Sequence, residues 1–295
     1  MRGELTGEQF LLQKKKNNKL LFVLKENKLA VIGLIIISVL GFLAVFAPYI
    51  APHDPYEQNL EIRLTSPNHE YIMGTDQFGR CLFGRILYGI RISLTTGLLS
   101  VVLTMGIGVM TGLPAGYFGG IIDELIMRMT DIVLSFPSIV LTLVIAGVLG
   151  PDLKNVIIAL ALVGWTKYCR VIRGSVLSVK EQDFVQSARA LGASDFYLLY
   201  RHILPNCIGP VIVLMTLNAG GTILSIAGLS FLGLGAQPPA AEWGMMLNQG
   251  IPFMQRAPYL SVFPGLAIMI TVIGFNFLGD GLRDIMDPRL KSRPF

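Results

Sequence analysis

Residues 29–50 read LAVIGLIIISVLGFLAVFAPYI, a 22-residue run without a charged side chain. An α-helix needs about 20 consecutive apolar residues to cross the hydrocarbon core of a bilayer. The run is longer than the roughly 7–15 apolar residues of a secretory signal peptide, and no A-x-A cleavage site follows it. We therefore interpret it as a membrane anchor that the protein retains.

The composition of the whole chain agrees with membrane insertion. The 295 residues are 53% hydrophobic and 15% charged, with a mean hydropathy of +0.61. A soluble domain carries about 25% charged residues, so a single soluble globule is excluded, as are disordered and fibrous chains. Three cysteines, Cys81, Cys169 and Cys207, have no CxxC spacing and indicate neither a disulfide framework nor a zinc site.

The hydropathy pattern predicts an all-α integral membrane protein with six transmembrane helices. The predicted spans are 29–50, 92–117, 131–149, 155–170, 208–235 and 260–280. The fourth is the weakest, because Lys167 and Arg170 shorten its uncharged part, and we expect Lys167 to extend toward the interface. Pro137 and Pro264 lie inside the third and sixth spans and should kink them.

The distribution of basic residues predicts the orientation. With six spans both termini share one side, and 18 of the 24 lysine and arginine residues fall on that side. Both termini should therefore be cytoplasmic, and the basic charge follows topology rather than nucleic-acid binding. The predicted organisation is a cytoplasmic segment 1–28, the first span 29–50, an extracytoplasmic loop 51–91, a five-span core 92–280 and a cytoplasmic tail 281–295.

Two groups inside the core indicate how helices pack. Gly108, Gly112 and Gly116 form two GxxxG steps on one face of the second span, where another helix could approach closely. Glu124, Arg128 and Asp131 stand at helical spacing near the start of the third span. We interpret this acidic and basic group as a solvated cluster at the interface, in which Arg128 pairs with both carboxylates.

Residues 176–205, VLSVKEQDFVQSARALGASDFYLLYRHILP, predict two short helices outside the membrane. Ser178 and Glu181 form an S-x-x-E capping box for the first helix, whose apolar stripe comprises Phe184, Val185, Ala188 and Leu191. Gly192 can end this helix, Ser194 can cap the second, and Pro205 should limit it. Such a pair can lie on lipid, pack on its own bundle or dock into another protein, and periodicity does not choose among these.

The same segment resembles the EAA loop of permease subunits of bacterial ABC importers. The family pattern is E-A-A, three residues, G, nine residues, I, one residue, L-P. This chain keeps the spacing together with Ala188, Gly192, Leu204 and Pro205, whereas Gln186, Ser187 and His202 replace the glutamate, the first alanine and the isoleucine. The resemblance implies that Gln186, Ser187, Ala188, Gly192, Leu204 and Pro205 belong to a loop that couples the spans to a cytoplasmic ATPase.

Three further stretches are similar to the C-type permease of the dipeptide, oligopeptide and nickel importer group. They are MGTDQFGRCLFGRILYGIRISL at 73–94, SFLGLGAQPPAAEWGMMLNQG at 230–250 and FPGLAIMITVIGFNFLGDGLRDIMDPRLK at 263–291. Cys81 stands where the group typically has aspartate. The resemblance covers about residues 29–291 and implies a multi-pass protein of the bacterial inner membrane.

The extracytoplasmic loop ends in an amphipathic pattern. Phe78, Leu82, Ile86 and Ile90 recur every four residues, with Arg80, Arg85 and Arg91 elsewhere, which predicts an interfacial helix. With residues 236–259, this surface is either a landing site for an external binding protein or a solvated cap. His53, Asp54, His69 and Glu70 are too poor a fingerprint to predict a metal site.

The resemblance implies partners that supply the energy. The chain has no G-x-x-x-x-G-K-[ST] motif, so ATP and Mg²⁺ should be bound by two partner ATPase subunits, with no catalytic residue, cofactor or metal in this chain. A homologous permease and an external substrate-binding protein complete the expected complex. Di- or oligopeptides are the expected cargo, with nickel or a metal chelate as the alternative. A stand-alone secondary transporter or channel is the alternative from another class.

Overall fold

The protein is a bundle of long helices in the computed structural model, which describes residues 28–286. The residues before 28 and after 286, which carry the predicted N-terminal segment and part of the C-terminal tail, lie outside the described residues. No strand forms between residues 28 and 286. The long helices are α2 (Lys28–Ile50), α3 (Leu82–Phe118), α6 (Leu153–Val179), α9 (Leu204–Phe231) and α11 (Tyr259–Met286).

A bent pair, α4 (Gly120–Leu134) and α5 (Ser138–Leu149), completes the set. Within the described part of the chain five helices are long and apolar enough to cross a membrane, and counting the bent pair as one span gives six. The expected all-α membrane fold is therefore confirmed. The loop after α2 carries the one-turn helix η1 (Leu60–Ile62).

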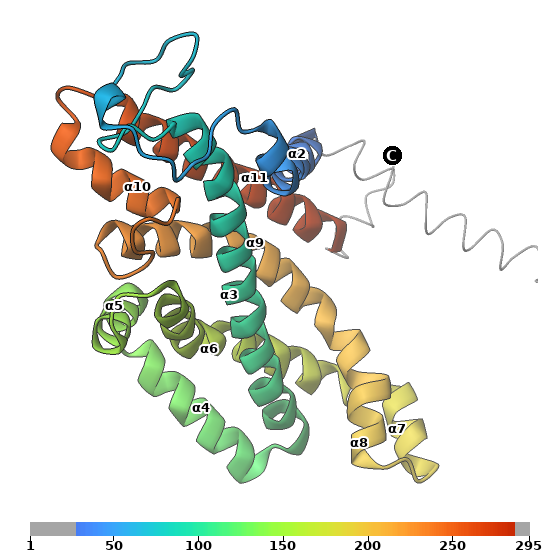
Figure 1. Ribbon diagram of the computed structural model, residues 1–295. Coiled ribbons are helices and arrows are strands. Elements are labelled where there is room, and N and C mark those ends of the chain that lie inside the picture. The colour runs from blue at the N-terminus through green and yellow to red at the C-terminus, as the bar shows by residue number, and fades with distance from the viewer. Residues whose placement is uncertain (1–27, 287–295) are drawn as a thin grey trace, which may run out of the picture.

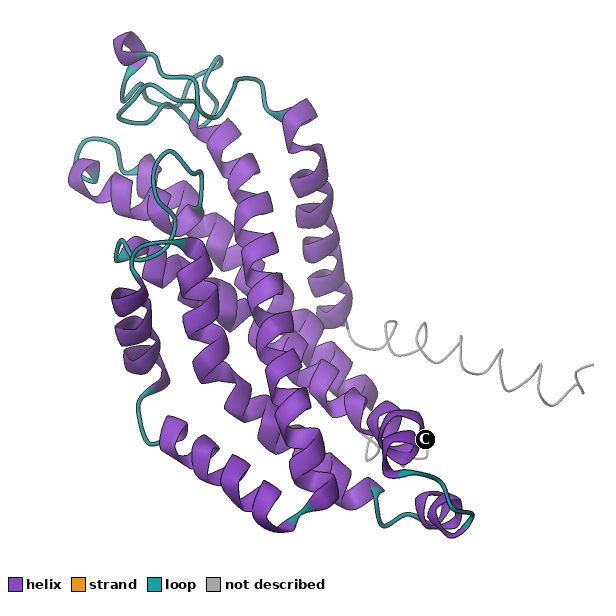
Figure 2. Ribbon diagram, turned by 60° about the horizontal axis from the view of Figure 1, so that its bottom comes forward, coloured by secondary structure: helices purple, strands orange, loops and turns teal. Residues whose placement is uncertain are grey.

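The short helices gather at opposite ends of the bundle. Between α6 and α9 the chain forms α7 (Asp183–Ala190), α8 (Asp195–Tyr197) and the π-helical turn η2 (Leu198–Ile203). Between α9 and α11 it forms α10 (Trp243–Gly250) and η3 (Ile251–Phe253). Figure 1 shows α7 and α8 far from α10, and Figure 2 shows the loop after α2 at the other end from α7 and α8. We refer to these as the α7–α8 end and the α10 end.

The third predicted span is wrong in form. Residues 131–149 are not one kinked helix, since α4 and α5 meet at 89° across a break of three residues, 135–137. Pro137 is the N-cap of α5 rather than an interior residue. Proline has no N–H and disfavours helical geometry in the residue before it, so the first helix ends and a second begins in another direction. Pro264, in contrast, lies inside α11.

The fourth span is longer than predicted. Its 27 residues run from Leu153 to Val179, and the Asp152 side chain caps its start by accepting from the Lys154 N–H. The prediction stopped at residue 170 because of the basic side chains. Two of these are ion-paired to α4, Arg170 with Asp131 and Arg173 with Asp123, which removes the reason to end the span there.

The predicted interfacial helix before the second span is also wrong. It is the first part of α3, which is continuous from Leu82 to Phe118. Leu82, Ile86 and Ile90 are buried in a hydrophobic cluster with residues of α2, α10 and α11, so this stretch lies inside the bundle. Burial of both faces also explains why Arg85, expected on the polar face, is 1% exposed.

The glycine face of α3 lies against α6. A Cβ atom at Gly108 would stand 2.8 Å from the carbonyl oxygen of Trp165, and one at Gly112 would stand 2.4 Å from that of Cys169. At Gly116 it would meet the Arg173 carbonyl oxygen at 2.9 Å. The two backbones are therefore in near contact over the two turns between Gly108 and Gly116, which only residues without a side chain allow.

Candidate functional site

The α7–α8 loop has its own local capping. Gly192 adopts a left-handed φ of +83°, and the bonds Gly192 N–H to Arg189 O and Ala193 N–H to Ala188 O close the end of α7 as a Schellman motif. The Ser194 side chain accepts from the Tyr197 N–H at the start of α8. The predicted roles of Gly192 and Ser194 as caps are thus confirmed.

Two other local predictions in this loop are wrong. Ser178 and Glu181 form no capping box, because α6 continues to Val179 and the N-cap of α7 is Gln182. Pro205 does not end a helix, since it lies in the first turn of α9 and follows the π-helical turn directly. The first turn of a helix tolerates proline, because its N–H groups have no partner within the helix.

The loop is attached to the end of α3 by a polar cluster. The Tyr117 hydroxyl donates to Asp195 Oδ1 at 2.5 Å and accepts from the Arg189 guanidinium at 3.3 Å. The Lys180 ammonium donates to the Gly116 carbonyl oxygen at 3.1 Å. Val185 is fully buried beneath α7. The side chains of α7 and α8 are therefore bonded directly to the end of α3.

The outer surface of the loop is apolar and exposed. Leu191 is 88% exposed and Phe196 71% exposed, and Phe184, Tyr197 and Tyr200 lie exposed beside them. The predicted stripe of Phe184, Val185, Ala188 and Leu191 is therefore split, because only Val185 faces the bundle in full. Large apolar side chains gathered in this way mark a surface that another molecule covers.

The residues of the EAA-like pattern occupy this loop and the start of α9. Gln186, Ser187, Gly192 and Pro205 are exposed, while Ala188 and Leu204 are half-buried. The Gln186 side-chain amide donates to the Lys180 carbonyl oxygen at 2.9 Å. An ionised glutamate has no proton to donate, so the glutamine makes a contact inside the loop that the residue it replaces could not make.

A cavity of about 670 Å³ opens between α3, the bent pair α4 and α5, α6 and α9. Most of its lining is apolar, and its polar lining residues offer hydroxyl groups, one amide and one ammonium group: Thr104, Ser138, Thr142, Thr166, Lys167, Tyr168, Asn218, Thr222 and Ser225. Its volume falls within the range of about 300–1,000 Å³ typical of small-molecule sites. Lys167 stands in the middle of α6, and its exposed side chain lines this cavity.

The charged residues near the start of the third span pair differently from the sequence prediction. Glu124 and Arg128 form the expected contact at 3.5 Å, and both are exposed. Asp131 pairs with Arg170 of α6 at 2.5 Å rather than with Arg128. Asp123 receives two bonds from Arg173. The cluster therefore fixes α4 to α6.

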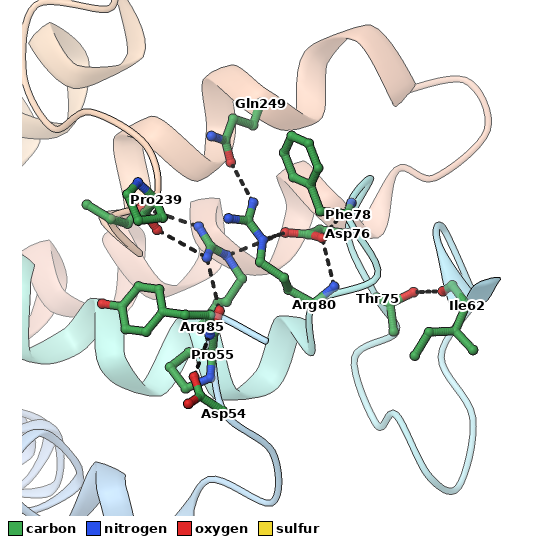
Figure 3. A network of polar contacts seen from close by, with 12 residues as sticks. Asp54, Pro55, Ile62, Thr75, Asp76, Phe78, Arg80, Arg85, Pro239 and Gln249 are labelled. Atoms are coloured by element: carbon green, nitrogen blue, oxygen red, sulfur yellow. Dashed lines mark hydrogen bonds and ion pairs between the residues drawn. The ribbon is translucent and has the colours of Figure 1, made fainter. Parts of the chain in front are cut away.

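The α10 end contains a buried ionic network that the sequence analysis missed (Figure 3). Asp76 accepts from Arg80 Nε at 2.6 Å and lies 3.6 Å from Arg85 Nε, and all three side chains are at most 5% exposed. Arg80 also reaches Gln249 of α10 at 3.4 Å. Arg85 donates to the carbonyl oxygens of Pro55, Pro239 and Ala240. The network fastens the loop after α2 to the loop before α10, and the Asp76–Arg80 spacing of four residues was the only signal for it.

Glu242 caps α10 in the same region. Its carboxylate accepts from the Met245 N–H at 2.9 Å, and the side chain is 1% exposed. Burial raises the pKa of the Glu242 carboxyl above its ordinary value, and the backbone hydrogen bonds from Met245 and Gly244 oppose that shift. No three His, Cys, Asp or Glu side chains of residues 28–286 come together as a metal site would require.

A membrane bundle with a cavity among its spans and an exposed helical loop between two of them has the arrangement expected of the membrane subunit of a transporter. The chain belongs to the family described as the binding-protein-dependent transport system inner membrane component, which matches residues 108–292. Residues 20–67 match the N-terminal transmembrane domain of oligopeptide transport permease C. The members of this family are membrane components of transport systems and are not enzymes.

Relatives of similar length support the assignment. The chain is 47% identical to the dipeptide transport system permease protein DppC of Alkalihalophilus pseudofirmus, over 91% of this chain and 88% of that protein. It is 44% identical to DppC of Haemophilus influenzae, over 92% of this chain and 94% of that protein. It is 42% identical to the glutathione transport system permease protein GsiD of Pectobacterium atrosepticum, over 91% and 89% of the two chains.

Solved structures share the fold. A chain of an amino acid ABC transporter crystallised with histidines matches with a TM-score of 0.52 and 16% identity, over 67% of this chain and 92% of that chain. A chain of the MetNI methionine ABC transporter in an inward-facing conformation matches with a TM-score of 0.51 and 17% identity, over 68% and 98%. This chain therefore has the helical arrangement of the membrane subunits of ABC transporters.

Proposed function

We propose that this permease subunit carries short peptides inward, from an external binding protein to the cell interior, in an importer driven by partner ATPases. The observation that carries the proposal is the exposed apolar surface of the α7–α8 loop in a chain 47% identical to a dipeptide permease. Peptide cargo is favoured over nickel because the relatives named above are dipeptide and glutathione permeases.

The exposed apolar side chains of the loop are suited to docking into a groove on a partner ATPase. Leu191 precedes the Gly192 turn and Phe196 follows it, and both exposed side chains would be buried on docking. In this proposal the residues Gln186, Ser187, Ala188, Gly192, Leu204 and Pro205 form the docking loop and its connection to α9. The α7–α8 end and both chain termini then face the cytoplasm, in keeping with the excess of lysine and arginine on that side.

The α10 end would receive the external binding protein. The buried network of Asp76, Arg80 and Arg85 holds the loop after α2 and the loop before α10 as one surface. A rigid surface is suited to receiving a protein, because little conformational freedom is lost on binding. A homologous permease would cover the side of the cavity and complete the pathway.

Alternating access follows from the contacts around the loop. Closure of the ATPases would move α7 and α8, and the Tyr117 cluster would carry that motion to α3. The ion pairs of Asp123 and Asp131 would move the α4–α5 pair together with α6. Because these helices surround the cavity, their rigid-body motion would open it to one side and then to the other.

Reconstitution in liposomes tests the proposal. The chain, its homologous permease and the two ATPases are reconstituted, and the uptake of a labelled dipeptide delivered by the binding protein is measured with and without ATP. We expect uptake only when all components and ATP are present. Uptake by this chain alone along an ion gradient, or uptake of nickel but no peptide by the complete complex, would overturn the proposal.

A further inference from the structure

A single lysine in the middle of α6 has no counter-charge among the residues that the structure describes. Lys167 lies 14 residues after Leu153 and 12 before Val179, so about 21 Å and about 18 Å of helix stand on its two sides. Among the described residues, its ammonium group takes part in no ion pair or hydrogen bond. Its side chain is exposed, and an ionisable residue within a spanning helix as a rule faces a pathway or a cavity.

The neighbouring ion pairs explain why this cation is left without a partner. On α6, Arg173 pairs with Asp123 and Arg170 pairs with Asp131, both of α4. Lys167 is one helical turn further toward the α10 end. At that level α4 has ended at Leu134, and the chain turns by 89° into α5. The row of carboxylates therefore stops where the cavity opens, and Lys167 lines that cavity.

The lining of the cavity indicates what Lys167 would bind. Within residues 28–286 no Asp or Glu lines the cavity, and Lys167 carries the one charge of that described lining. Ser138 and Thr142 of α5 and Asn218 and Ser225 of α9 offer hydroxyl and amide groups to the same cavity. A ligand with one carboxylate and adjacent amide groups matches this combination, because the ammonium pairs with the carboxylate and the neutral groups bond to the amides.

We propose that Lys167 binds the C-terminal carboxylate of a short peptide during its passage through the cavity. The inference rests on the proposed function and adds to it a position inside the membrane at which the cargo is recognised. An anionic lipid headgroup would offer the same charge. The peptide is preferred because the relatives of this chain are dipeptide and glutathione permeases, and the experiment below separates the two ligands.

The test compares Lys167→Gln, Lys167→Arg and wild type in the complete reconstituted complex. Lys154→Gln is the matched control, since Lys154 is an exposed lysine in the first turn of the same helix. Each complex receives a dipeptide with a free carboxylate and the same dipeptide as its C-terminal amide. The affinity of the binding protein for each form is measured separately, and both forms are supplied at saturation of that protein.

We expect wild type and Lys154→Gln to import the free acid in preference to the amide. Lys167→Gln should reduce this preference by about tenfold, as loss of one charge-assisted hydrogen bond predicts. Lys167→Arg should retain most of the preference, which also shows that the position tolerates substitution. ATP hydrolysis stimulated by the loaded binding protein should continue in Lys167→Gln, which shows that the complex is assembled.

Two results would overturn the assignment of Lys167. One is an unchanged acid-to-amide preference in Lys167→Gln, with import as fast as in Lys154→Gln. The other is an effect of Lys167→Gln that appears only in liposomes of anionic lipid and is equal for both peptides, which would assign the lysine to a headgroup. Absence of peptide import by the wild-type complex is a different outcome, because it contradicts the proposed function itself.

Discussion

The contact between α3 and α6 can be tested at Gly112. An alanine there would place its Cβ 2.3 Å from Ile172 Cγ2, 2.4 Å from the Cys169 carbonyl oxygen and 2.9 Å from the Cys169 Cα. The isoleucine methyl group can rotate away, but the two backbone atoms cannot. Ordinary contact begins at 3.4 Å, so the carbonyl contact is about 1 Å too short and α6 must move outward as a unit.

Gly106 of the same helix provides the matched control, because a Cβ there would meet nothing within 4 Å. Both substitutions replace glycine by alanine inside α3, so the gain in helix propensity, up to about 1 kcal/mol, is common to both and cancels in the comparison. The difference that remains is the cost of overpacking, about 1–3 kcal/mol against Gly112→Ala.

The assay is thermal unfolding of the purified protein in one detergent, with all variants measured side by side. Gly106→Ala should unfold at or above the wild-type temperature and Gly112→Ala clearly below it. Because α3 and α6 also line the cavity, Gly112→Ala should in addition slow ATP-dependent import. Equal unfolding temperatures for the two variants would refute the close approach of the two backbones.

Three further predictions concern the two ends of the bundle. Gly192→Glu places a residue with a side chain at a φ of +83°, at a cost of about 1–2 kcal/mol, and adds a charge to the docking loop. The number of ATP molecules hydrolysed per peptide imported should therefore rise, while the complex still assembles. Tyr117→Phe removes the hydroxyl that joins Arg189 to Asp195. Amide hydrogen exchange of residues 183–197 should become faster, because the free energy of local opening should fall by about 1 kcal/mol. Because the pKa of Glu242 is raised in the folded protein, folding favours its protonated form, so this carboxyl lowers stability progressively as the pH rises above its ordinary value of 4.5. Glu242→Gln keeps a side-chain oxygen that can cap α10 but cannot ionise. The unfolding temperature of this variant should therefore fall less than that of the wild type as the pH rises. Identical pH profiles for the two proteins would contradict the assigned burial of Glu242.

Much of the fold could be predicted because each signal lies within one segment. A helix in lipid must satisfy all of its backbone hydrogen bonds internally, so a long apolar run such as 29–50 has few alternatives to a span. The caps at Gly192 and Ser194 involve atoms only a few residues apart, and the sequence predicted both correctly. The EAA-like spacing likewise identified the family from local sequence.

Contacts between helices were not available from the sequence. Periodicity indicates neighbours three or four residues apart, so Asp131 was assigned to Arg128 on its own helix. Its partner is Arg170 on α6, chosen by the way the two helices pack. For the same reason Lys167 appeared to mark the end of a short span.

The sequence by itself thus determined that the chain spans a membrane, that it is all helical and to which family it belongs. Only the tertiary structure decided the right-angled break after α4, the burial of Arg80 and Arg85, and the cavity in which Lys167 has no counter-charge. The physical reason is that a hydropathy run depends on the environment shared by a whole segment. The environment of a single charged side chain depends on the particular atoms that other helices bring beside it.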